Sequence, residues 1–207
     1  MRIRAYFEFV IFLFLAISCQ HAYTYIIETD INKLAPDRKN GETIIQSNEK
    51  ARKFFDEVTN NTVGKMIPHL KITDTLGNKK DLQDVLSGKT IIISSDLYCG
   101  FGEEGLLNDF PKAMKRIGAE KNHLRIICLI KKQQDDEENP KRLINTLKEL
   151  NRYYTDIYII NELESRKINL FANPTRLYIN KDKVVTHIAL GISTIELLES
   201  ELRENLN

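Results

Sequence analysis

The chain has little of several residue types that define protein classes. Its 207 residues include three cysteines, five prolines, nine glycines and no tryptophan. So few cysteines exclude a scaffold held together by many disulfides. The low glycine and proline content excludes a low-complexity chain. A hydrophobic content of 42% and a charged content of 29% are typical of one globular domain of mixed class.

The chain also lacks an excess of charge of either sign. Its formal net charge is +1, with basic and acidic residues interleaved along most of its length. Interleaved charges are typical of a solvated surface, and they provide no basic patch for a nucleic acid. We therefore expect no nucleic-acid partner. We also expect the protein to be a monomer.

The N-terminus has an apolar run that is too short to cross a bilayer. The run extends from Phe9 to Ile17, whereas a spanning helix needs about 20 residues. Arg2 and Arg4 precede the run and small residues follow it, as in a secretory signal peptide. The run ends in "LAISC", which resembles a bacterial lipobox, so Cys19 is expected to become the lipid-bearing first residue of the mature protein.

This interpretation predicts three regions. Residues 1–18 are the signal peptide, residues 19–63 form a tether and N-terminal extension, and residues 64–207 form the main domain. Two or three acyl chains on Cys19 give stable membrane anchoring, which places the domain in a bacterial cell envelope, facing the periplasm. Gln20 is not the aspartate that retains lipoproteins in the inner membrane of some bacteria, which favours the outer membrane. The alternative is an ordinary secreted protein that keeps a free Cys19.

Past residue 64 the pattern becomes regular. "TIIISSDL" and "HLRIICLI" are continuous apolar runs, as expected for strands covered on both faces. Between them, residues 103–118 place their apolar side chains on one helical face. Strands joined by such a helix run parallel, through a right-handed crossover. Cys128 lies inside the second run, where we expect a small buried side chain rather than a disulfide partner.

The C-terminal part predicts a hairpin and a helix. "TRLYINKDKVVTHIAL" reads as two alternating strands joined by a turn near Asn180 to Lys183, and "STIELLESELRENL" as the closing helix. The expected fold is α/β, with a central mixed sheet and helices on both of its faces.

Three segments in the same order resemble one protein family. They are "GKMIPHLKITDTLGNKKDLQDVLSGKTIIISS", "YCGFG" and "FANPTRLYINKDKVVTHIALG". Together they resemble the thioredoxin-like domain of bacterial envelope thiol-disulfide oxidoreductases, the TlpA-like group. The resemblance covers residues 64–207 and implies the thioredoxin fold.

The resemblance also implies a site. Cys99 occupies the position of the catalytic nucleophile, and Tyr98 stands where the family has a tryptophan. Pro174 takes the place of the family's cis-proline, and the backbone of Asn173 would pair with a bound peptide. A cysteine before a helix can have a lowered pKa, which favours the reactive thiolate.

The motif "CGFG" lacks the family's second cysteine. Gly100 and Phe101 lie between Cys99 and the missing position and are expected to contact substrate, but Gly102 cannot resolve a mixed disulfide. Release would then need a thiol from outside the chain. Gly102 and the later Gly105 are also expected to loosen the first turns of the helix.

Two functions remain open from the sequence. One is a single-cysteine thiol-disulfide oxidoreductase that acts through Cys99, on exported proteins with thiols or disulfides or with an external reducing thiol. The other is a redox-inactive module that binds a protein or a ligand. No cofactor and no metal are expected, because Cys99 with Glu103 and His187 is a poor set of ligands for a soft metal.

Overall fold

The computed structural model describes residues 24–30, 44–96, 100–118, 124–132 and 140–206. Seven strands in these residues form one sheet, in the order β2-β1-β5-β4-β3-β6-β7. The strands are β1 (Lys71–Asp74), β2 (Lys79–Asp81), β3 (Thr90–Asp96), β4 (Arg125–Lys132), β5 (Asp156–Asn161), β6 (Thr175–Ile179) and β7 (Val185–Leu190).

The sheet is mixed, as the sequence predicts. β3 pairs with β4 and β4 with β5 in parallel, whereas β3–β6, β6–β7, β1–β5 and β1–β2 are antiparallel. Every residue of β3 is buried, because this strand lies between β4 and β6 and both of its faces are covered. The predicted hairpin of β6 and β7 is confirmed, with Asn180 and Lys183 hydrogen-bonded in its turn.

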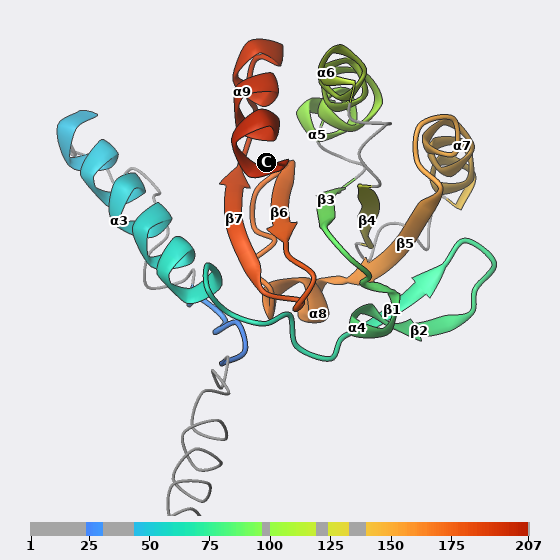
Figure 1. Ribbon diagram of the computed structural model, residues 1–207, viewed down its shortest axis with the longest axis horizontal. Coiled ribbons are helices and arrows are strands. Elements are labelled where there is room, and N and C mark those ends of the chain that lie inside the picture. The colour runs from blue at the N-terminus through green and yellow to red at the C-terminus, as the bar shows by residue number, and fades with distance from the viewer. Residues whose placement is uncertain (1–23, 31–43, 97–99, 119–123, 133–139, 207) are drawn as a thin grey trace, which may run out of the picture.

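Helices cover both faces of the sheet (Figure 1). They are α3 (Ile44–Thr62), α4 (Leu82–Val85), α5 (Gly100–Glu104), α6 (Phe110–Ile117), α7 (Pro140–Leu150), α8 (Glu162–Arg166) and α9 (Ile195–Leu206). α6, α7 and α9 lie on one side of the sheet and α4 and α8 on the other, while α3 stands beside β7 (Figure 1). The fold class is therefore the predicted α/β arrangement.

Side chains of β3 alternate between two hydrophobic cores. Ile92 belongs to the core on the side of α4 and α8, which also contains Phe54 and Val58 of α3. Ile91 and Ile93 belong to the core under α6, α7 and α9. Alternate residues of a strand point to opposite faces, so consecutive isoleucines serve both cores.

The segment after β3 is not one regular α-helix. Residues Gly105–Asp109 form a π-helical turn, η1, between α5 and α6. The Tyr154 hydroxyl donates a hydrogen bond to the Leu106 carbonyl, 2.6 Å away. Single π-helical turns inside α-helices are rare and are frequently found at functional sites. The periodicity of apolar residues predicts the helix here but not the wider turn.

The N-terminal segment packs into the same fold. Asn169 joins it to the rest of the chain. Its Oδ1 accepts a hydrogen bond from the Thr29 amide, 2.9 Å away, and its Nδ2 donates to the Ile27 carbonyl and the Thr62 hydroxyl, at 3.0 and 2.8 Å. Ile26 is buried in the core that also contains Phe54. Residues 24–30 and α3 thus contribute to the core of the domain.

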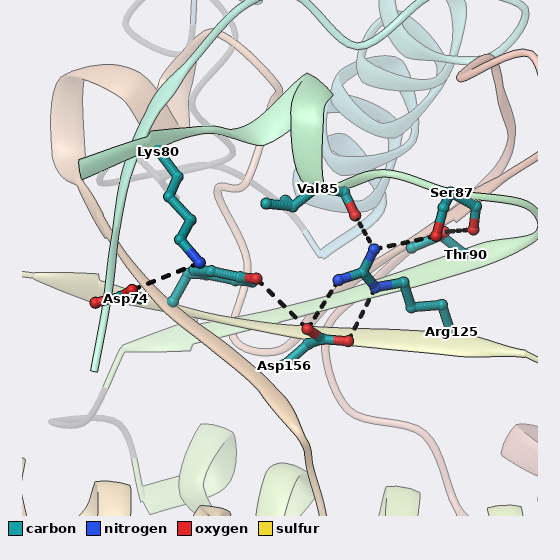
Figure 2. Close-up of polar contacts among 8 residues, drawn as sticks. Asp74, Lys80, Val85, Ser87, Thr90, Arg125 and Asp156 are labelled. Atoms are coloured by element: carbon teal, nitrogen blue, oxygen red, sulfur yellow. Dashed lines mark hydrogen bonds and ion pairs between the residues drawn. The ribbon is translucent and has the colours of Figure 1, made fainter. Parts of the chain in front are cut away.

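The edge of the sheet where the parallel strands begin carries a polar network (Figure 2). The Arg125 guanidinium donates to both carboxylate oxygens of Asp156, at 2.9 and 2.8 Å, to Ser87 Oγ at 3.0 Å and to the Val85 carbonyl. The bonds with Asp156 raise the pKa of Arg125. This network joins the first residues of β4 and β5 to the loop after α4. It therefore lies at the opposite end of the parallel strands from the last residue of β3.

None of the helices in the described residues is long and apolar enough to cross a membrane.

Candidate functional site

The candidate site lies where β3 ends and α5 begins. β3 ends at Asp96 and α5 starts at Gly100. The neighbouring strand β6 starts at Thr175, which pairs with Ser94, so Pro174 lies beside the end of β3. The Asn173–Pro174 peptide bond is cis, as the resemblance implies.

Two glycines let the helix approach this proline closely. A Cβ added at Gly105 would lie 3.2 Å from Pro174 Cγ and 3.5 Å from its Cδ. A Cβ added at Gly102 would lie 3.3 Å from Asn173 Cβ. Glycine allows such approaches because it has no side chain. The prediction that these glycines loosen the helix stays a prediction, and the structure adds that they let it pack against Asn173 and Pro174.

A pair of polar side chains joins the end of β3 to the segment that precedes β6. The Asp96 amide donates a hydrogen bond to Asn173 Oδ1, 3.1 Å away, and Asn173 Nδ2 donates to Asp96 Oδ2. Asp96 is only 8% exposed. A buried carboxylate is costly unless it is hydrogen-bonded, and the amide of Asn173 satisfies this need. We call these two residues the Asp96–Asn173 pair.

The predicted site residues divide into two groups. Asn173 lies against α5, the first helix after Cys99, and Pro174 lies against η1. Gly100 is exposed at the start of α5, where no heavy atom of the described residues comes within 4 Å of an added Cβ. Phe101 follows in the same helix. Tyr98, Cys99 and Cys19 lie outside the described residues. The roles assigned to all of these residues stay predictions.

Cys128 is excluded as an alternative nucleophile. Its side chain is completely buried in the core that contains Ile91 and Ile93. Burial raises the pKa of its thiol well above the ordinary value, so the reactive thiolate does not form near neutral pH. The prediction of a small buried side chain is confirmed.

The polar side chains of the described residues do not gather into a metal site. No group of three or more histidines, cysteines, aspartates or glutamates in this part of the chain is placed to hold a metal ion. His187 on β7 is half-buried, and its ring centroid lies 5.4 Å from that of Tyr178.

Ser95 and Asp96 are site residues that sequence reasoning did not assign. Both follow the apolar part of "TIIISSD", and both are buried although polar. Two consecutive polar residues at the end of a buried strand indicate polar partners nearby, since buried polar groups need hydrogen bonds. The Ser95 hydroxyl donates to the neighbouring Asp96 carbonyl, whereas Asp96 is bonded to Asn173, 77 residues away, which no local pattern reveals.

Solved structures share this architecture. A thioredoxin-like protein from Bacteroides caccae superposes with a TM-score of 0.52 and 15% identity over 84% of this chain. This chain spans 60% of the length of that protein. The thioredoxin domain of a thiol-disulfide oxidoreductase from Bacteroides vulgatus gives a TM-score of 0.52 and 12% identity, covering 70% of this chain and 99% of that domain. No protein-family model matches the chain, and no curated protein matches it in sequence.

These likenesses establish the fold. The mixed sheet and the helices on both of its faces are those of a thioredoxin fold, with structural neighbours among thiol-disulfide oxidoreductases. A fold can carry many functions, so the activity of this chain has to be argued from its own site.

Proposed function

We propose that the protein is a single-cysteine thiol-disulfide oxidoreductase of the bacterial cell envelope that acts through Cys99. The observation that carries this proposal is the close packing of α5 and η1 on Asn173 and Pro174, with a glycine at each contact. The family resemblance implies that the nucleophile is the residue just before this helix and that it faces the cis-proline. In the sequence, Cys99 is that residue.

The chemistry needs two thiol-disulfide exchanges. The Cys99 thiolate attacks one sulfur of a substrate disulfide, so a bond forms between Cys99 and that sulfur, and the other substrate sulfur leaves as a thiolate and takes up a proton. An external thiolate then attacks the substrate sulfur of the mixed disulfide. This releases Cys99 as a thiolate and leaves the substrate joined to the external thiol, with electrons balanced over the two steps.

Two features of the site affect the first step. Backbone amides at the start of a helix favour an anion, which lowers the pKa of a cysteine placed there. Glu103, in the first turn of α5, opposes a nearby thiolate through its negative charge. We expect the helix to outweigh the carboxylate, because Glu103 is partly solvated and screening weakens its charge.

The proposal predicts that envelope proteins become trapped on Cys99. With the full chain expressed in a bacterial envelope and thiols blocked by acid and alkylation, mixed disulfides should appear as bands that disappear on reduction. Cys99→Ser should remove them completely, whereas Cys128→Ala should keep them, because the Cys128 thiol is buried. Bands of equal intensity in Cys99→Ser would reject this function.

A redox-inactive binding module is the second candidate. It is favoured by the space at Gly102, which is too small for any side chain and so for a second thiol. Such a module would use the wall formed by Asn173 and Pro174 to bind a protein or a ligand. In that case a partner would be captured equally well by the Cys99→Ser variant and without a covalent bond.

The envelope location rests on the N-terminal sequence. We propose that Cys19 carries the lipid anchor and that the outer membrane holds it. Labelling of the full chain with a fatty acid should be lost in Cys19→Ala and unchanged in Cys128→Ala, with membrane fractionation reporting which membrane carries the label. Labelling that persists in Cys19→Ala would overturn the anchor.

A further inference from the structure

The position of the missing second cysteine has no room for a side chain. A Cβ added at Gly102 would lie 1.8 Å from Ser95 Oγ, 3.1 Å from Ser95 Cβ and 3.3 Å from Asn173 Cβ. Non-bonded carbon atoms pack best at about 3.5–4.0 Å. The contact with Ser95 Oγ is far shorter than any non-bonded contact, whereas the other two are tight and need only small shifts.

Ser95 is not free to withdraw from this contact. It is completely buried in β3, where it pairs with Ile130 of β4. Its hydroxyl donates a hydrogen bond to the Asp96 carbonyl, 3.1 Å away. Rotating the hydroxyl would relieve the shortest contact only by breaking this bond.

The other side of the space is also fixed. Asn173 is held by the Asp96–Asn173 pair, with its amide bonded to both the backbone and the side chain of Asp96. Gly102 lies in α5, outside the left-handed region of the backbone, so the constraint on this glycine is one of space. Gly100, two residues earlier, has open space around an added Cβ.

We infer that Ser95 is a specificity-determining residue that keeps the site to a single thiol. The inference rests on the proposed function of Cys99. Because Ser95 and Asn173 fill the space at position 102, an intramolecular thiol cannot resolve the mixed disulfide on Cys99. The second substrate is then an external thiol, which attacks the substrate sulfur and leaves Cys99 as a thiolate.

The test introduces a second thiol with and without Ser95. The full chain, Gly102→Cys and Ser95→Ala/Gly102→Cys are treated with the aromatic disulfide dithiobis(nitrobenzoate), and the released thiolate is counted while peptide mass spectrometry locates the adduct. Wild type and Gly102→Cys should release one equivalent from Cys99 and keep the adduct. The double variant should release a second equivalent at least about tenfold faster than Gly102→Cys, because its second thiol is three residues from Cys99 in the same chain and attacks intramolecularly.

Two results would overturn the inference. One is a second equivalent released by Gly102→Cys as fast as by the double variant, and the other is no second equivalent from the double variant. Failure of the proposed function looks different. In that case Cys99 of the native wild type takes no adduct, although it does so in denaturant.

A thermal measurement keeps the inference testable if a cysteine variant does not fold or Cys99 does not react. Gly102→Ala should lower the melting temperature of the full chain by about 3–10 °C, as expected for an overpacked site. Ser95→Ala/Gly102→Ala should recover most of that loss. Gly100→Ala, at the open position, should melt at the wild-type temperature or above it. Wild-type melting of Gly102→Ala would contradict the steric account.

Discussion

Glu201→Ala should lower the free energy of unfolding by about 3–5 kcal/mol, because it leaves a buried guanidinium without its counter-ion. Arg176 is 2% exposed. Its Nε and Nη2 donate to the two carboxylate oxygens of Glu201 on α9, at 2.8 and 2.9 Å. Its remaining bonds go to the Gly191 carbonyl and the Ser193 hydroxyl. This network fastens the C-terminal helix to β6, two residues after Pro174.

Tyr178 adds to the same network. Its hydroxyl donates a hydrogen bond to Glu201 Oε1, 2.7 Å away. Burial, together with the negative charge of Glu201, raises the pKa of Tyr178 well above its ordinary value, so the hydroxyl stays protonated and remains a donor. Loss of Glu201 therefore leaves two buried donors without their acceptor, which increases the expected cost.

Chemical denaturation of the full chain measures this effect. Glu199→Ala is the matched control on the same helix, because its ion pair with Arg116 lies at the surface, with the two side chains 23% and 55% exposed, and surface pairs contribute about 1 kcal/mol or less. Arg176→Met/Glu201→Met removes both charges and should recover much of the loss. Equal stability of Glu201→Ala and Glu199→Ala would show that the buried pair does not hold α9 in place.

Phe54→Ala should cost about 3–5 kcal/mol of unfolding free energy, as expected for a phenylalanine removed from a core. Phe54 is 8% exposed and belongs to the core with Ile92 of β3. Its ring also faces Phe171, with centroids 6.1 Å apart, so α3 packs on the chain just before Asn173. We therefore expect α3 to unfold together with the rest of the domain.

The neighbouring phenylalanine supplies the control for this second effect. Phe55 is 45% exposed, and Phe55→Ala should change the unfolding free energy by about 1 kcal/mol or less. Both variants keep the same helix and differ in which ring is lost. Equal costs for the two, measured by denaturation of the full chain, would mean that α3 adds little to the stability of the domain.

Much of the fold could be read from local patterns. The run "TIIISS" predicts a strand buried on both faces, and the alternation around Asn180 predicts the β6–β7 hairpin, because these features depend on nearest neighbours along the chain. The cis bond at Pro174 came from the family resemblance, since "NPT" by itself is typical of an ordinary turn.

The parts that could not be predicted depend on contacts between distant residues. Asn169 binds Thr29, which is 140 residues away in the sequence, and no periodicity reveals such a partner. The close contact between Gly102 and Ser95 could not be predicted for the same reason. The cost of this glycine to a helix can be estimated locally, but its contact with Ser95 depends on how α5 folds back over β3.

The central claim is that Cys99 is a reactive thiol, and the pH dependence of its alkylation in the full chain tests this most directly. The rate should be followed by peptide mass spectrometry, with Cys128 as the buried internal control. We predict a midpoint below the ordinary cysteine pKa of about 8.5, while Cys128 stays unmodified. A midpoint at or above the ordinary value, or equal modification of the two cysteines, would contradict the account.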